Sequence, residues 1–267
     1  MRTALLLVAA LAVSDSVTAP AGFLRATAVR VTPGQTLEVT LPEMQPDDVD
    51  WMFFRAAGHQ ENRDTATPNE RGAVPFLAPH ADTCMIGLDR KPRVQEVSAR
   101  ALESWFRAAL GEPPRGFEVA DPDAAVRVRR VESSKLLVRI GAEGADDVPS
   151  ATPQSKSGQM TEIRPLADPT TVPLGSVLPM RIYAPGAPEE AVAQRVIARH
   201  PATGRVVSSE VREGGIAQFE VSESGTWLVE AHTVTKPEGR AEVAWSLFTA
   251  TLTFEAAESM EFGEDDR

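Results

Sequence analysis

The sequence is poor in cysteine, histidine and aromatic residues. Its one cysteine, Cys84, excludes an intrachain disulfide and any zinc or iron–sulfur site built from several cysteines. Only four histidines are present, there is no Gly-x-Ser-x-Gly motif, and no glycine-rich loop of the common phosphate-binding types occurs. The sequence therefore indicates no catalytic residues and no nucleotide site, and we expect a protein that is not an enzyme.

Basic residues are also in short supply. Lys and Arg number 27 against 38 Asp and Glu, which gives a net charge of −11. Binding to nucleic acid by phosphate neutralisation needs a basic stripe, which the sequence lacks, so no nucleic-acid partner is expected. After the first 21 residues no apolar run approaches the ~20 residues needed to cross a bilayer, so we expect no transmembrane segment in the mature chain.

The first residues have the pattern of a secretory leader. A basic residue precedes an apolar run from Ala4 to Val13, and small residues follow. Cleavage after Ala19 or after Ala21 fits the small-x-small rule, and Pro20 disfavours the first of these. We predict that residues 1–21 are a signal peptide and that the mature protein is periplasmic or secreted.

The pattern of residues 22–143 predicts an N-terminal β-rich domain. Apolar residues alternate from Leu37 to Leu41, as in a half-buried strand. Two further β-rich runs, Val126 to Val131 and Lys135 to Gly141, predict a hairpin whose turn is Glu132 to Ser134.

Residues 93–110 predict one amphipathic helix in this domain. Apolar residues recur there at steps of three or four, and charged residues occupy the other face. Gly111 and the prolines after it end the helix. We interpret the apolar stripe as core packing against a sheet rather than as a cofactor site. The stripe consists of Val94, Val97, Ala101, Trp105 and Ala109.

The second half of the chain reads as another β domain. Residues 144–158 are rich in small and polar residues and predict a linker. Residues 159–256 hold seven short strand signals at nearly regular spacing, which is typical of an immunoglobulin-like sandwich. Residues 257–267 carry five acids and one arginine and predict an acidic disordered tail. The fold class is thus mainly β, with two β-sandwich-like domains. The predicted strands are Thr161–Leu166, Val177–Tyr183, Gln194–His200, Arg205–Val211, Ile216–Val221, Thr226–Val234 and Ala244–Phe254.

Metal binding is the one chemistry that the histidines could support. His80, Asp82 and Cys84 alternate and would share one face of a strand, although Cys84 has the apolar neighbours of a buried core thiol. Glu230 and His232 repeat this spacing on the face opposite Trp227, Val229 and Ala231. His59, in a polar loop, could add a ligand, whereas His200 reads as the flank of a turn. The alternative, that these are incidental histidines on solvated sheet faces, stays open.

Several segments resemble a domain-of-unknown-function family of periplasmic proteins linked to nickel or cobalt uptake. The resemblance rests on Ser157 to Pro169, on Gly225 to His232, on Ala250 to Phe254 and on Glu103 to Gly111. It implies an immunoglobulin-like sandwich, a divalent transition metal (nickel, cobalt or zinc) and a membrane uptake system as partner.

The chain departs from this family at its mature N-terminus. Members begin there with a histidine, whereas Gly22-Phe23 has none, so only His59 and His232 carry the metal role over from the resemblance. Three hypotheses follow. The first is a non-enzymatic binding protein that assists metal uptake; the second is a structural or adhesive immunoglobulin-like module without a metal role; the third is a hydrolase with an unrecognised site.

Overall fold

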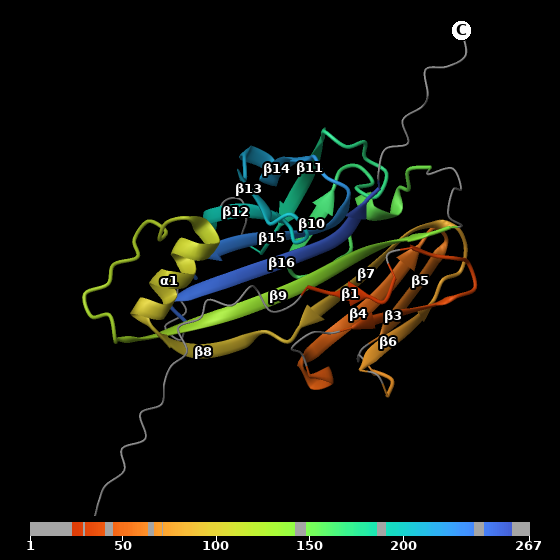
Figure 1. The fold of residues 1–267 in the computed structure, drawn as a ribbon. Coiled ribbons are helices and arrows are strands. Elements are labelled where there is room, and N and C mark those ends of the chain that lie inside the picture. Colours follow the sequence, from red (N-terminus) through yellow and green to blue (C-terminus); the bar gives the residue numbers. More distant parts are fainter. Residues whose placement is uncertain are drawn as a thin grey trace, which may run out of the picture.

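The computed structural model describes residues 23–28, 30–40, 45–63, 67–70, 72–141, 148–185, 191–237 and 243–257. The predicted signal peptide and residues 258–267 of the predicted tail lie outside these ranges. Most of the described residues belong to β-strands, which confirms the mainly β prediction (Figure 1). None of the helices described has the length and apolar character that crossing a bilayer would require.

The N-terminal part of the chain forms a sandwich of two antiparallel layers. Its small sheet has the order β1-β3-β6 and faces strands ordered β5-β4-β7-β9. Apolar side chains from both layers, such as Leu37, Phe54 and Phe76, form the core between them. The predicted strand at Leu37 is confirmed as β3. The strands are β1 (Arg25–Ala26), β3 (Thr36–Thr40), β4 (Val49–Ala56), β5 (His59–Arg63), β6 (Ala73–Leu77), β7 (Asp82–Arg90) and β9 (Ala125–Ile140), with β2 (Arg30–Val31) beside β9 and the short helix η1 (Pro46–Asp48) before β4.

The C-terminal part forms a second sandwich, and all seven predicted strands are confirmed. The small sheet β10-β11-β14 faces strands ordered β13-β12-β15-β16. Trp227, Val229 and Ala231 point into the core between the layers, as their alternation predicts. The strands are β10 (Glu162–Pro165), β11 (Ser176–Tyr183), β12 (Ala191–His200), β13 (Arg205–Glu210), β14 (Ile216–Val221), β15 (Gly225–Thr235) and β16 (Trp245–Ala256), with the short helices η2 (Thr152–Gln154) before β10 and η3 (Glu213–Gly215) before β14.

The two sandwiches have the same topology. In each, apart from β2 and β8, the first, second and fifth strands form the small sheet, and the third, fourth, sixth and seventh form the larger one. This is an immunoglobulin-like arrangement of seven strands. The last strands, β9 and β16, pair in parallel, from Val128 with Trp245 to Leu136 with Thr253. The larger sheets therefore merge into one ten-stranded sheet, which is visible along the middle of Figure 1.

The two small sheets cover opposite faces of the merged sheet. Leu136 packs into the core under β1-β3-β6, whereas its neighbour Leu137 packs into the core under β10-β11-β14. Successive side chains of a strand point to opposite faces, so this split places the small sheets on either side of β9. The two predicted domains thus share one sheet.

The predicted hairpin at residues 126–141 is wrong, because these residues form the single 16-residue strand β9. Glu132, Ser133 and Ser134 are typical turn residues, but each has a hydrogen-bond partner next to the strand. Arg90 Nη1 donates to Glu132 Oε2 at 2.6 Å, and the carbonyl oxygen of Ser134 accepts a hydrogen bond from Gln159 Nε2 at 3.0 Å. Ser133 Oγ accepts from the Thr161 backbone N–H at 3.4 Å. Polar side chains satisfied in this way allow a strand to continue through them.

The helix begins later than predicted. The helix α1 spans Ala99–Leu110, and residues 93–98 form the strand β8 (Arg93–Ser98), which pairs with the first half of β9. Ser98 Oγ accepts the Ala101 N–H at 3.1 Å and caps the helix, whose end at Gly111 is as predicted. Val94 and Val97 therefore lie in a strand, and Ala101 is exposed. The residues that α1 buries are Ala99, Leu102, Phe106 and Ala109.

The helix packs against the second sandwich, although it is inserted between β7 and β9 of the first. Phe106 contacts Trp245 at the start of β16, with ring centroids 5.6 Å apart. The other buried members of this small apolar cluster are Leu102, Val128, Val234 and Leu247. In this way α1 covers the face of β15 and β16 that the sheet β10-β11-β14 leaves free.

Candidate functional site

Glu230 and His232 lie together on the α1 side of β15, as predicted. Glu230 Oε2 is 3.2 Å from His232 Nε2, and Arg199 Nε donates to Glu230 Oε1 at 3.2 Å. The other ring nitrogen of His232 lies 3.3 Å from Thr249 Oγ1, and the indole of Trp105 meets the imidazole edge-on. Both nitrogens of this buried imidazole therefore have protein partners, and the pair joins α1 to the sheet.

The three residues predicted to share one strand face, of which His80 and Asp82 are the predicted metal ligands, do not all lie in the strand. His80 precedes β7, so the alternation within the strand includes Asp82 and Cys84 only. Asp82 Oδ2 accepts a hydrogen bond from Thr152 Oγ1 at 2.9 Å, which ties η2 to the edge of the sandwich. His59 is exposed at the start of β5.

His59 and His232 belong to distant parts of the merged sheet. Strands β5 and β15 are five steps apart in the strand order, and steps of ~4.8 Å put about 24 Å between them. Among the residues that the structure describes, no group of three or more His, Cys, Asp or Glu could hold a metal ion. These two histidines therefore do not share a site, and metal binding at either one stays a prediction.

The remaining thiol and imidazole have structural surroundings. Cys84 is fully buried, and burial raises the pKa of its thiol far above the ordinary value. This confirms the prediction of a core cysteine. His200 ends β12 beside the turn that follows, also as predicted, and its Nε2 lies 2.9 Å from the carbonyl oxygen of Ser224. Its ring packs on Trp227 at 5.3 Å between centroids.

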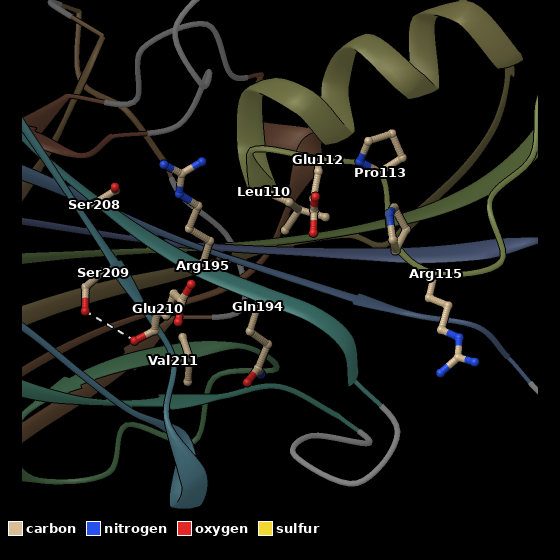
Figure 2. Close-up of a pocket in the computed structure, with 11 residues that line it drawn as sticks. Leu110, Glu112, Pro113, Arg115, Gln194, Arg195, Ser208, Ser209, Glu210 and Val211 are labelled. Atoms are coloured by element: carbon tan, nitrogen blue, oxygen red, sulfur yellow. Dashed lines mark hydrogen bonds between the residues drawn. The ribbon is translucent and has the colours of Figure 1, made fainter.

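A hollow of about 610 Å³ lies between the C-terminal end of α1 and the strands β12 and β13 (Figure 2). Its size is within the range of small-ligand sites. Figure 2 shows Glu112 extending from the helix end and Arg195 rising from β12. Arg195 Nη1 would be 2.6 Å from a Cβ at position 111, so the glycine there leaves room for the guanidinium. That helix end carries the negative pole of the helix dipole, which favours a cation.

Four charged side chains in the hollow have no ion-pair partner among the described residues: Glu112, Arg115, Arg195 and Glu210. Hydroxyl and amide groups lie beside them, from Ser208, Ser209 and Gln194. The sequence does not predict this site, because its walls come from a helix terminus and from strands some 80 residues later in the chain. The glycine that ends the helix, followed by Glu112 and Arg115, was the available signal.

A buried ion pair links the second sandwich to the sheet of the first. Lys135 Nζ donates to Glu162 Oε1 at 2.7 Å and to the carbonyl oxygen of Ile163 at 3.0 Å. Both charged side chains are at most 1% exposed. Burial lowers the pKa of the Lys135 ammonium, the Glu162 carboxylate opposes this, and the charges of Arg55 and Arg164 add to the lowering.

Two more buried carboxylates hold the segment before β10 against β7. Asp89 Oδ2 accepts the indole N–H of Trp51 at 2.9 Å and the backbone N–H of Met160 at 3.1 Å. Burial raises the pKa of Asp89, while these hydrogen bonds partly offset the rise. Asp168 Oδ2 accepts from Thr83 Oγ1 at 2.7 Å and from the Ser150 N–H at 2.9 Å. Residues 148–158 of the predicted linker are thus packed on the first sandwich, and residues 144–147 lie outside the described ranges.

No protein-family model and no curated protein matches the sequence. Among solved structures, fibronectin(III)-like modules of Clostridium thermocellum CbhA are similar over 91% of this chain and 100% of theirs, with 8% identity and a TM-score of 0.24. Murine CEACAM1b is similar over 88% of this chain and 98% of its own, with 8% identity and a TM-score of 0.20.

The three N-terminal domains of the bacteriophage RB49 highly immunogenic outer capsid protein are similar over 89% of this chain and 99% of theirs, with 9% identity and a TM-score of 0.21. Scores at this level carry no argument about the chain. Its immunoglobulin-like character rests on the strand order described above.

Proposed function

We propose that the protein is a non-enzymatic, immunoglobulin-like binding module that works in the periplasm or outside the cell, and that the hollow beside α1 is its partner site. The observation that carries this is the set of charges of both signs in one concave surface without ion-pair partners among the described residues. Such charges are available to a partner, and complementary charges across an interface set the specificity and rate of association.

The fold supports this role because the two walls of the hollow belong to sandwiches that are held together by strand pairing and packing. One wall is the end of α1, which is inserted in the first sandwich, and the other is β12 with β13 of the second. Parallel pairing of β9 with β16 and the packing of Phe106 on Trp245 connect the two. A preorganised site of this kind loses less conformational entropy on binding than a flexible one.

The chemistry of the hollow favours a polypeptide segment that carries both an acid and a base. A partner carboxylate would be bound by the Arg195 guanidinium, which presents several N–H donors in a fixed plane. A partner amine or guanidinium would be bound by Glu112 or Glu210. Ser208 and Gln194 can hydrogen-bond the partner backbone.

Selection from a library of displayed peptides tests this function. Peptides selected on the full chain should lose about tenfold or more in affinity to Arg195→Ala and to Glu210→Ala, a loss of roughly 1.4 kcal/mol or more each. Arg100→Ala, an exposed arginine of α1 outside the hollow, is the matched control and should bind like the unmodified chain. Peptides that bind all four proteins equally well would contradict the proposal.

Transition-metal binding at Glu230 and His232 is a second candidate, because their nearest ring nitrogen and carboxylate oxygen are 3.2 Å apart. A membrane uptake system would then be the partner. Titration with nickel, cobalt and zinc should give binding that His232→Ala removes and that His59→Ala, about 24 Å away across the sheet, leaves unchanged. An isotherm insensitive to His232→Ala, or none at all, would eliminate this candidate.

A further inference from the structure

Four basic side chains gather around the single tyrosine of the chain, on and beside the outer face of β10 and β11. Lys156 Nζ lies 5.4 Å, and the Arg164 guanidinium 5.1 Å, from the centre of the Tyr183 ring. Arg181 is directly opposite Arg164 in the register of the two strands. Arg55 reaches the same place from β4, where it donates to the carbonyl oxygen of Lys156 at 2.8 Å. We call these four cations the cationic cluster.

The described residues leave the cationic cluster without a compensating acid. None of its members has an ion pair with any of them. Glu162, the acid beneath it, is engaged by the buried ammonium of Lys135. Like charges directly opposite each other on paired strands are destabilising, as with Arg164 and Arg181. In a protein of net charge −11, this arrangement favours an anionic occupant.

A hollow of about 450 Å³ adjoins the cluster at Arg55. Its lining includes His59, Thr152 and Ser155, and the hydroxyls of the last two already donate within the protein, to Asp82 and to the Thr152 carbonyl oxygen. None of its lining residues is acidic. A chain segment bearing carboxylates therefore has space next to the cations.

We propose that the cationic cluster binds the acidic C-terminal segment of the same chain, residues 258–267. This segment carries five acids and one arginine, and three of the acids, Glu264, Asp265 and Asp266, are consecutive. Carboxylates on guanidinium and ammonium groups form charge-assisted hydrogen bonds, which are stronger than neutral ones. The proposal is independent of the partner site beside α1.

The covalent path is long enough for this contact. Leu252 of β16 pairs with Lys135, whose ammonium lies beside β10 under the cluster. Five further residues of extended chain place Ala257 about 17 Å from that point. Glu264 lies seven residues beyond Ala257, a reach of about 24 Å, which suffices for the return.

The tether also gives this segment an advantage over acids from other molecules. A site joined to its ligand by a short chain experiences an effective concentration in the millimolar range. Even weak affinity of the cluster for carboxylates then keeps the segment bound. Exposed charges are screened when the salt concentration rises, so the contact should dissociate in about 1 M salt, where the Debye length is about 3 Å.

Zero-length crosslinking of the full chain tests the proposal, because the protein has only four lysines: Lys91, Lys135, Lys156 and Lys236. A carbodiimide joins a carboxylate to a lysine amine only where the two touch, and peptide mass spectrometry locates the bond. We expect Lys156 joined to Glu264, Asp265 or Asp266 within monomeric protein, and several-fold less of this product in 1 M sodium chloride.

Removal of charge from the cluster provides the variant test. Arg164→Gln with Arg181→Gln should reduce the Lys156 product several-fold, whereas Arg100→Gln with Arg127→Gln, which removes two exposed arginines elsewhere, should not. Crosslinks of the segment to Lys91 or Lys236 at equal yield, a Lys156 product indifferent to salt, no product at all, or a product only between two chains would each overturn the proposal. The salt comparison needs no variant, so it decides the matter even if the double variant fails to fold.

Discussion

The buried pair Lys135 and Glu162 is the residue-scale feature that most distinguishes this fold from a plain apolar sandwich. Taking two charges out of water costs several kcal/mol each, and mutual attraction recovers this only when the geometry is good. The pair meets part of that condition, since Nζ has two acceptors, whereas Glu162 Oε2 has no partner among the described residues. We therefore expect that the folded state tolerates either buried charge only while the other one is present.

Substitution of one partner should cost far more than substitution of both. Lys135→Met leaves a buried carboxylate without its cation and should lower the free energy of unfolding by about 3–5 kcal/mol. Lys135→Met with Glu162→Leu should recover most of that loss. Urea unfolding of the two single variants and the double variant measures the difference, and additive losses would contradict this account.

Asp89 should give the stability a pH dependence of its own. Its pKa is raised on folding above the unfolded value of 3.8, so the folded state binds more protons between that value and the folded pKa. The contribution of Asp89 is present below pH 3.8 and is lost as the pH rises through this window. Compared with Asp89→Asn, the unmodified protein should lose stability more steeply with rising pH there. Chemical unfolding at a series of pH values measures the free energy of unfolding of both proteins, and parallel profiles for the two would refute this expectation.

For single residues, the sequence predicts which face of a strand a side chain occupies better than it predicts which residues that side chain contacts. Alternation along residues 227–232 correctly places Trp227 inward and Glu230 with His232 on the other face, because a strand has a strict period of two. The partners of Lys135 and Asp89 come from 27 to 71 residues away, and the helix end that leaves room for Arg195 is more than 80 residues away, so local patterns contain no signal for them. The predicted metal residues His59 and His232 belong to distant strands for the same reason: spacing along the chain does not specify which strands become neighbours.

At the scale of elements, the strand β9 and the helix α1 show where local patterns mislead. The seven strands of the second sandwich are short, rich in apolar residues and bounded by turn residues, which is why all seven are predictable, including β15 and β16, which are buried on both faces. In β9 three polar residues in sequence resemble a turn, yet the strand continues through them because Glu132 bonds to Arg90 of the neighbouring strand β7 and Ser133 to the backbone of Thr161. In β8 the spacing of Val94 and Val97 also fits a helix, but the segment is a strand because its backbone pairs with β9.

The helix α1 should stabilise the second sandwich even though it belongs by sequence to the first. Phe106 is fully buried against Trp245 and Phe117, so Phe106→Ala should lower the free energy of unfolding by about 3–5 kcal/mol. Hydrogen exchange should increase in β15 and β16, which α1 covers. Increased exchange confined to α1 and β8 would contradict this packing role.

At the scale of the whole molecule, two sandwiches of the same topology share a sheet instead of being joined only by a linker. The parallel pairing of β9 with β16 and the buried polar contacts of residues 148–168 make each half part of the other's environment. The sequence predicts the seven strands of the second half, but in the first half only the strand at Leu37. The sequence does not predict that the two halves share a sheet, because neither β9 nor β16 has a pattern that identifies the other as its partner.

Unfolding should therefore be a single cooperative event. Two independent domains of this size would unfold separately, whereas a continuous sheet couples them. Differential scanning calorimetry should give one transition, with calorimetric and van't Hoff enthalpies in agreement. Two resolved transitions would show that the shared sheet does not couple the halves.

The position of β16 at the end of the chain has a consequence for biosynthesis. Its partner β9 leaves the ribosome more than a hundred residues earlier, and until β16 arrives the backbone amides and carbonyls of residues 128–136 are without the strand that covers them. An uncovered strand of this length is a template for association with other nascent or newly exported chains. A chaperone that shields extended segments would thus have a defined client region here, and premature termination before Trp245 would produce aggregation rather than a stable half-molecule.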